Sequence, residues 1–190
     1  MKKGKLVTLS GVSGAGKSHL VKDLLASNLG FENVPSVTTR KPRDGENGNL
    51  HFLDIDEFKY LEKNGEFVLV GTIFGNQYTF FKKDFEKLDK GIHLITEYYY
   101  KLFEDFKQMF PEQIGTYILP YNPNLSIKAI DERNSPEEEK LKRKFILSEE
   151  LNWIAKKENQ NLFDIIHTNT YNEQSIMDFR TIIKNELERK

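Results

Sequence analysis

Short apolar runs alternate along the chain with stretches in which apolar residues recur every three or four positions. The runs are typical of buried strands, and the periodic stretches are typical of helices. Strands are expected at residues 5–9, 92–97, 115–119 and 164–168. Helices are expected at residues 17–29, 99–110 and 172–190. Because strands that alternate with helices build a mainly parallel sheet covered on both faces, the pattern predicts a three-layer α/β core.

Two regions interrupt this alternation. Residues 35–90 contain a strand-like segment at 66–74 between short helical patterns at 54–63 and 82–90, and residues 122–158 have a densely charged helical pattern. We therefore expect a single domain that carries a strand-rich insert and a helical insert. The domain is expected to span residues 1–190, with its core at residues 1–34, 91–121 and 159–190.

The segment between the first strand and the first helix reads GVSGAGKS and fits the P-loop spacing G-x-x-x-x-G-K-[ST]. Its glycines let backbone N–H groups point inward at phosphate oxygens, and the following helix adds the positive end of its dipole. Lys17 can reach the outer phosphates, and the Ser18 hydroxyl can join a magnesium shell. A plain glycine-rich turn is the alternative, but the strand–loop–helix context favours a P-loop. The predicted ATP-binding residues of the loop are Ser13, Gly14, Ala15, Gly16, Lys17 and Ser18.

The first insert, residues 35–90, carries a candidate site for a phosphorylated acceptor. Arg40 and Arg43 flank Pro42, and two guanidinium forks can clamp a monophosphate. Tyr78 can add a hydroxyl donor. The alternative for the arginines is a solvated charged loop.

The second insert, residues 122–158, resembles what a closing lid requires. A kinase of a small molecule excludes water by closing mobile segments over the phosphates. Arg133 and Arg143 can stabilise the charge on the moving phosphoryl group, so they join Lys17 as predicted catalytic residues. The alternative is a surface helix with ion pairs at helical spacing, such as Glu139 with Arg143.

Composition and charge narrow the class of protein. Lys and Arg number 28 and Asp and Glu number 29, so a dedicated nucleic-acid binder is disfavoured. The chain has no cysteine, which excludes disulfides and thiolate zinc sites. No stretch approaches 18 apolar residues and no signal peptide is visible, so the cytoplasm is the expected location. A regulatory GTPase is disfavoured because no N-K-x-D-like stretch occurs.

Residues 36–46 read SVTTRKPRDGE and closely resemble the S-x-T-T-R-x-P-R-x-G-E signature of the guanylate kinase family. The order of the segments NGEF at 64–67, GNQY at 75–78 and FDIIHTN at 163–169 is similar to that family as well. Arg133, and Arg143 with the pair Glu150-Leu151, resemble its lid. The resemblance covers nearly the whole chain.

The resemblance implies an enzyme that transfers phosphoryl groups from ATP, with Mg²⁺, to a nucleoside monophosphate, most directly GMP. It implies an acceptor-binding subdomain at residues 35–90 and a lid at 122–158. It also implies ATP and the monophosphate as the partners, without nucleic acid or membrane, in a monomer or weak homodimer. The implied acceptor-binding residues are Ser36 toward the base, Arg40, Arg43 and Tyr78 toward the phosphate, and Glu46 in support. The implied residues on the ATP side are Asn169 near adenine, and Ser18 with Glu97, through water, at the metal.

The sequence departs from the family pattern where guanine would be recognised. Leu69 stands where the family has a glutamate, and Tyr99 replaces a second acid. A carboxylate accepts both N–H donors of the guanine edge, so its loss predicts weaker GMP turnover. An aromatic pocket that includes Phe74, Phe80 and Tyr98 is one interpretation, and plain core packing of these residues is the other.

Two alternatives to a guanylate kinase remain open on the sequence. One is a related enzyme for another nucleotide or a sugar phosphate. The other is a non-catalytic guanylate-kinase-like binding module, which is disfavoured because Gly16, Lys17 and Ser18 are intact.

Overall fold

The computed structural model describes residues 3–42, 50–73, 75–132 and 134–189. Within these ranges, no helix is both long and apolar enough to cross a membrane. Three predicted site residues, Arg43, Glu46 and Arg133, lie outside the described residues.

A five-stranded sheet forms the core, with the strand order β2-β7-β1-β8-β9. Every neighbouring pair in this sheet is parallel, which confirms the predicted α/β class. All four predicted core strands are present, and β2 is added at the edge. The strands are β1 (Leu6–Gly11), β2 (Phe31–Asn33), β7 (His93–Glu97), β8 (Ile114–Pro120) and β9 (Ile165–Asn169).

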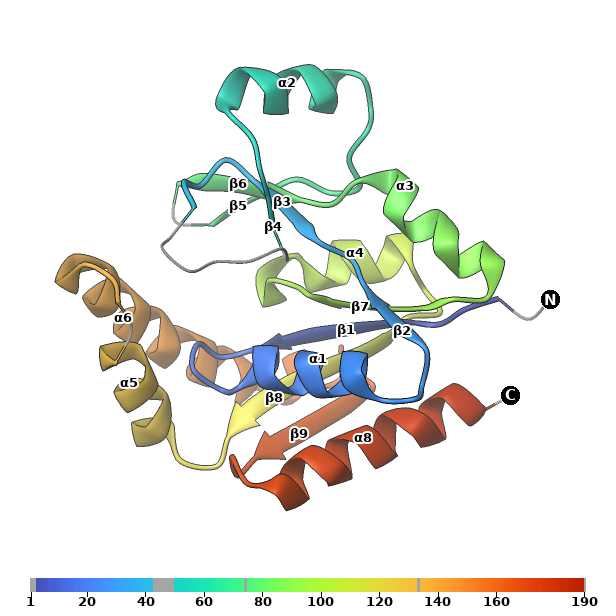
Figure 1. The fold of residues 1–190 in the computed structure, drawn as a ribbon. Helices are drawn as coiled ribbons and strands as arrows, with labels where there is room; N and C mark the ends of the chain where they lie inside the picture. The colour runs from blue at the N-terminus through green and yellow to red at the C-terminus, as the bar shows by residue number, and fades with distance from the viewer. Residues whose placement is uncertain (1–2, 43–49, 74, 133, 190) are drawn as a thin grey trace.

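Helices cover both faces of this sheet. Helices α1 (Lys17–Ala26) and α8 (Glu173–Glu188) lie on one face, and α4 (Phe103–Met109), which follows a short 3-10 turn, lies on the other (Figure 1). The apolar sides of the helices pack with the central strands into one cluster. Its fully buried members include Leu9, Leu20, Leu24, Phe103, Tyr117, Phe179 and Ile183.

Helix α1 ends earlier than its apolar pattern predicts. The expected end was residue 29, but the last helical residue is Ala26, and Ser27 adopts an extended backbone. The Ser27 hydroxyl donates to the carbonyl of Leu24 at 2.6 Å. A serine side chain that satisfies a terminal carbonyl competes with the next turn of helix, which explains the early end.

The first insert forms a second, smaller sheet with the order β4-β3-β6-β5. Its strands are β3 (Ser36–Thr38), β4 (Leu50–Phe52), β5 (Gly71–Ile73) and β6 (Asn76–Thr79). Asp54 caps α2 (Ile55–Lys63), which lies at the outer side of this sheet (Figure 1). Among the described residues 66–73 of the strand expected at 66–74, only Gly71–Ile73 pairs continuously, and Phe67 makes an isolated bridge to Phe81. The chain returns to the core through α3 (Lys82–Phe85) and the 3-10 helix η1 (Glu86–Lys90).

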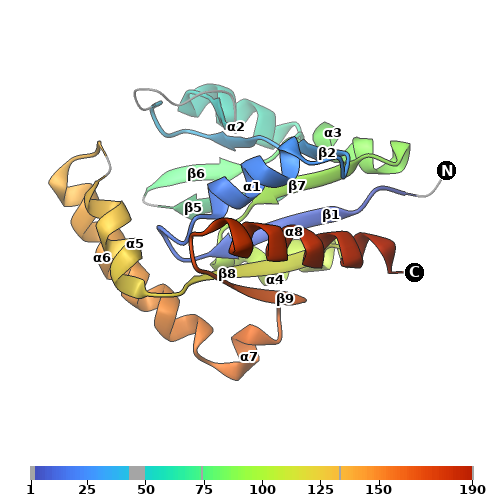
Figure 2. The same cartoon turned by 60° about the horizontal axis from the view of Figure 1, so that its bottom comes forward.

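The second insert is helical, as predicted. It consists of α5 (Pro123–Asp131), α6 (Glu137–Ile154) and the short α7 (Lys157–Gln160). Figures 1 and 2 show α5 and the first turns of α6 beyond the carboxyl ends of β1 and β8, whereas both chain termini lie at the opposite end of the sheet. This placement puts the helical insert and the smaller sheet on two sides of the loop that follows β1.

Candidate functional site

The loop between β1 and α1 has the backbone conformation that its glycines predict. Gly14 and Gly16 have φ angles of 81° and 84°, in the left-handed region that favours glycine. A Cβ atom at Gly16 would lie 2.5 Å from the side-chain nitrogen of Asn169, so this position has no room for a side chain. The Lys17 ammonium donates to the carbonyls of Gly11 at 2.7 Å and Val12 at 3.0 Å, which holds it over the loop.

Three side chains from distant parts of the chain support this loop from outside. The Asn169 amide donates to the Ala15 carbonyl, and the Tyr171 hydroxyl donates to the Gly14 carbonyl, each at 2.9 Å. On the other side, Oε2 of Glu150 accepts the backbone N–H of Ser13 at 2.9 Å. Asn169 is therefore a buried support of the phosphate loop, with 2% of its surface exposed, and its predicted place near adenine stays a prediction.

Sequence reasoning missed the parts played by Tyr171 and Glu150. Tyr171 follows the end of β9 and has a positive φ of 61°, which is uncommon for a residue other than glycine. The sequence did offer a signal for Tyr171, the polar segment Asn-Thr-Tyr-Asn at the carboxyl end of a parallel strand. Ligands bind at that edge of a parallel sheet. Glu150 was noted only as part of the resemblance to the lid, and no local signal predicts its contact with Ser13, because the two residues lie 137 positions apart.

The predicted metal-shell residues meet directly. The Ser18 hydroxyl donates to Oε1 of Glu97 at 2.7 Å. Glu97 is the last residue of β7, and the parallel register pairs it with Leu9 of β1, beside the phosphate loop. A hydroxyl and a carboxylate are hard oxygen donors, and Mg²⁺ favours a few such donors together with water and phosphate oxygens. The two residues therefore fit a magnesium ion held with a nucleotide.

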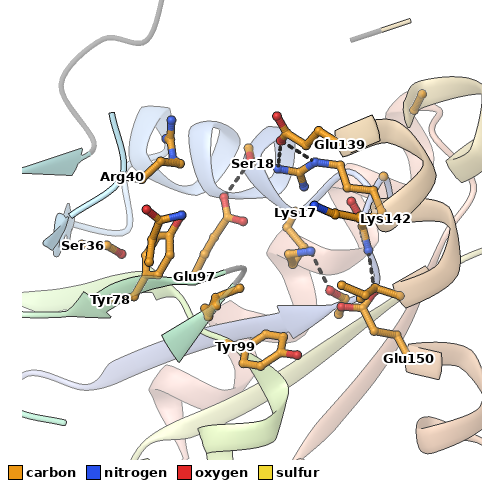
Figure 3. Close-up of a pocket in the computed structure, with 18 of the residues that line it drawn as sticks. Lys17, Ser18, Ser36, Arg40, Tyr78, Glu97, Tyr99, Glu139, Lys142 and Glu150 are labelled. Atoms are coloured by element: carbon orange, nitrogen blue, oxygen red, sulfur yellow. Dashed lines mark hydrogen bonds and ion pairs between the residues drawn. The ribbon is translucent and has the colours of Figure 1, made fainter. Parts of the chain in front are cut away.

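A cavity of about 1080 Å³ opens over the loop, and the two inserts form its opposite walls. Figure 3 shows Arg40, Ser36 and Tyr78 on one side and Glu139, Lys142 and Glu150 on the other, with Lys17, Ser18 and Glu97 between them. Ordinary small-molecule pockets measure about 300–1,000 Å³. The size and two-sided lining suit two ligands placed end to end.

The acceptor wall brings together the described residues of that predicted group. Tyr78 of β6 pairs with Thr38 of β3, and Ser36 begins the same strand β3. One guanidinium N–H of Arg40 donates to the carbonyl of Lys41 at 2.8 Å, and the guanidinium lies 5.3 Å from the centroid of the Phe52 ring. All three predicted residues line the cavity.

On the lid wall, Arg143 lines the cavity and is paired within its own helix. Its Nε and one terminal nitrogen donate to Oε1 of Glu139 at 3.0 and 2.8 Å. This is the ion pair that the sequence offered as the alternative to a functional role. Because both partners line the cavity, the pair keeps the guanidinium there rather than removing it.

The aromatic residues near the acceptor wall divide between core and cavity. Phe80 and Leu69 belong to a second apolar cluster with Leu94 and Phe106, so core packing is the right interpretation for Phe80. Tyr98 stacks on Phe80 with 5.6 Å between ring centroids, and it also lines the cavity with Tyr99. Leu69 packs into this cluster and is not among the described residues that line the cavity. Phe74 lies outside the described residues.

Comparison with known proteins gives a consistent match. The family model described as guanylate kinase matches residues 3–186. A guanylate kinase of Prochlorococcus marinus is 32% identical over 183 residues, which are 95% of this chain and 97% of that protein. A guanylate kinase of Clostridium tetani is 33% identical over 181 residues, covering 93% and 86% of the two chains. The crystal structure of guanylate kinase from Anaplasma phagocytophilum superimposes with a TM-score of 0.75 at 22% identity, over 100% of this chain and 89% of that one, and shows the same fold.

Proposed function

The chain belongs to the guanylate kinase family, and from that premise we propose that it transfers the terminal phosphoryl group of ATP to GMP. In this reaction a phosphate oxygen of GMP bonds to the γ-phosphorus, the bond from that phosphorus to the bridging oxygen breaks, and GDP and ADP leave. The observation that carries the proposal is the facing arrangement in one cavity. Lys17 and the Ser18–Glu97 pair lie opposite Arg40 and Tyr78, so a triphosphate and a monophosphate can meet.

The loop and its lysine serve the ATP side. The loop precedes the N-terminus of α1, where backbone N–H groups and the helix dipole favour phosphate. The Lys17 ammonium is held at the loop by two carbonyls and adds a positive charge near the outer phosphates. Phosphoryl transfer depends mainly on positioning and charge stabilisation, which these groups provide.

Ser18 and Glu97 would hold magnesium at the same point. The Ser18 hydroxyl would bind the ion, and the Glu97 carboxylate would reach it through water. When bound, Mg²⁺ neutralises charge on the β- and γ-phosphates during transfer. Their 2.7 Å hydrogen bond supports this assignment, because it shows that the two oxygens lie close enough to serve the same ion.

The two inserts serve the acceptor and the closure of the site. Residues 35–90 would bind the monophosphate, with Arg40, Arg43 and Tyr78 at its phosphate, Ser36 toward its base and Glu46 in support. Residues 122–158 would close as a lid, carrying Arg133 and Arg143 to the transferred group. We expect the chain to act on these two small molecules as a monomer or weak homodimer.

The proposal is tested by ADP release in a panel of monophosphates: GMP, dGMP, IMP, AMP, pyrimidine nucleotides and sugar phosphates. GMP is expected to support turnover. IMP lacks the 2-amino group, and Leu69 offers no carboxylate to that group. The ratio of kcat/KM for GMP over IMP is therefore expected to stay below about tenfold. Much faster turnover of a different acceptor would mean that this acceptor, and not GMP, is the substrate. No turnover with any acceptor would favour a binding module.

A further inference from the structure

Glu150 connects the helical insert to the phosphate loop, and the function proposed above assigns it no role in the reaction. It lies on α6, where most residues are at least partly exposed, yet only 5% of its own surface is exposed. Its Oε2 accepts the N–H of Ser13 at 2.9 Å. This hydrogen bond joins the insert to the third residue of the GVSGAGKS segment.

The Val12–Ser13 peptide carries the consequence of this contact. The N–H of Ser13 and the carbonyl of Val12 belong to one planar peptide unit, so they turn together. The carbonyl end accepts from the Lys17 ammonium at 3.0 Å, while the N–H end donates to Glu150. Glu150 and Lys17 therefore form hydrogen bonds with opposite ends of the same planar peptide unit. Rotation of the peptide would break both of these hydrogen bonds, together with the one that the Val12 carbonyl accepts from the Ala15 N–H at 3.2 Å.

An ionised Glu150 carboxylate in this buried position costs free energy, so a contribution to stability alone does not explain the residue. Burial raises the pKa of its carboxyl, while the Ser13 N–H and the positive charges of Lys17, Arg143 and Lys101 favour the ionised form. Replacing a buried ionic group with an apolar one of similar size often leaves stability unchanged or improved. A carboxylate at this position is thus better explained by its contact with the loop than by packing.

The same face of α6 also presents the lid arginine. Arg143 and Glu150 are seven positions apart, which is close to two helical turns, so they lie on one side of the helix. Both residues line the cavity. An anchor at Glu150 therefore also limits where the Arg143 guanidinium can lie relative to the phosphate loop.

We propose that Glu150 is a positioning residue that fixes the Val12–Ser13 peptide and, through it, the Lys17 ammonium. It makes the geometry of the phosphate loop depend on the docking of α6. The proposal deepens the function proposed above and rests on it only where it concerns turnover.

Three variants test this role: Glu150→Ala, Glu150→Gln and the matched control Glu149→Ala. Glu149 is the neighbouring carboxylate on α6 and is exposed. Removing a hydrogen bond to a charged group should lower kcat/KM for ATP in Glu150→Ala by about tenfold to a hundredfold. Glu150→Gln keeps an oxygen acceptor at the same reach and is expected to restore most of that loss. Glu149→Ala is expected to behave as the parent.

A second readout does not depend on turnover. The backbone N–H proton of Ser13 should resonate downfield in the nuclear magnetic resonance spectrum of the parent, because it is donated to a carboxylate. It should move upfield in Glu150→Ala, and by less in Glu150→Gln. If Glu150→Ala does not fold, the Gln variant and the parent still give this comparison.

Two results would overturn the role of Glu150. One is a kcat/KM for ATP in folded Glu150→Ala within about twofold of Glu149→Ala, which is the range of an ordinary surface change. The other is a Ser13 resonance that neither Glu150 variant moves. If the parent shows no turnover, the proposed function fails, while the Ser13 measurement still decides whether Glu150 holds the loop.

Discussion

The two walls of the cavity are held in different ways. On the ATP side, the loop is held by Asn169 and Tyr171 at the end of β9 and by Glu150 of α6, all of which lie far from the loop in the sequence. On the acceptor side, two hydrogen bonds of the cavity wall run within the first insert, whereas Leu69 and Phe80 pack the insert against Leu94 and Phe106 of the core. The Thr39 hydroxyl accepts the N–H of Gln77 at 3.0 Å, and Arg40 donates to its neighbour Lys41.

This difference indicates how the two halves contribute. The ATP half is preorganised by the core, so its groups are in place before a ligand arrives, and little ordering cost remains. The acceptor half is a separate small sheet that packs on the core through apolar residues such as Phe80, while its polar groups Arg40 and Tyr78 line the cavity. Substitutions in the first half should therefore affect ATP and stability together, and those in the second should affect the acceptor alone.

The largest effect is expected from Lys17→Ala. The change removes the ammonium that two loop carbonyls hold, so Mg-ATP binding should be lost and turnover should fall by at least about a hundredfold. Isothermal titration with Mg-ATP and an ADP-release assay measure both. Lys22→Ala, exposed on α1, is the matched control. Unchanged ATP affinity in Lys17→Ala would remove the basis for the comparison between the two walls.

Arg40→Ala tests the acceptor wall. Losing a charge-assisted pair of hydrogen bonds to phosphate should raise KM for GMP by about tenfold to a hundredfold, with KM for ATP unchanged. Initial rates with each substrate varied in turn give the two constants. Lys59→Ala, which removes an exposed charge from α2 in the same insert, is the control. An equal rise in both KM values would mean that the walls are not independent.

Sequence predicted the parts of the site that depend on local spacing. The phosphate loop and Ser18 were predicted from spacing, because a loop fixes its own geometry, whereas the role of Glu97 at the metal was implied by the family resemblance. The parallel sheet followed from the alternation of apolar patterns. The contact between Ser18 and Glu97 needed only one further fact, that β1 and β7 are neighbours.

The supports of the loop could not be predicted in the same way. Glu150 contacts Ser13 only because α6 packs across the end of the sheet, and no local pattern encodes that packing. The place of Asn169 near adenine stays a prediction, and its hydrogen bond to the loop was not foreseen because a resemblance transfers residues without their contacts. The end of α1 was predicted too late, because the apolar pattern continues past Ser27 although the Ser27 hydroxyl binds the Leu24 carbonyl and ends the helix.

Asn169→Ala is expected to have a smaller effect, shared between stability and ATP. The buried amide donates to Ala15 and accepts from the Tyr171 N–H and the Ser175 hydroxyl. Its loss leaves buried partners unpaired and should lower the free energy of unfolding by about 2 kcal/mol. Urea denaturation and Mg-ATP titration measure the two effects. Asn185→Ala, exposed on α8, should change neither. Loss of stability with unchanged ATP affinity would mean that Asn169 stabilises the core without positioning the phosphate loop for ATP.

The smallest effect concerns the pH dependence of stability at His167, which lies two residues before Asn169. Burial lowers the pKa of this imidazole from its usual value of 6.5, and its Nε2 lies 3.1 Å from the Ser175 hydroxyl. As the pH falls below about 6.5, the unfolded chain therefore binds a proton that the folded chain does not. The free energy of unfolding should decrease on acidification, by at most about 1.4 kcal/mol per pH unit from this group.

His167→Gln isolates that contribution, because glutamine does not titrate. Urea denaturation near pH 7.5 and pH 5.5 should show a smaller decrease for the variant than for the parent. His19→Gln, at an exposed position of α1, should keep the decrease of the parent. Equal decreases in the parent and in His167→Gln would show that the strand end beneath the loop tolerates a charge. In that case the ATP half would be less rigidly built than its hydrogen bonds indicate.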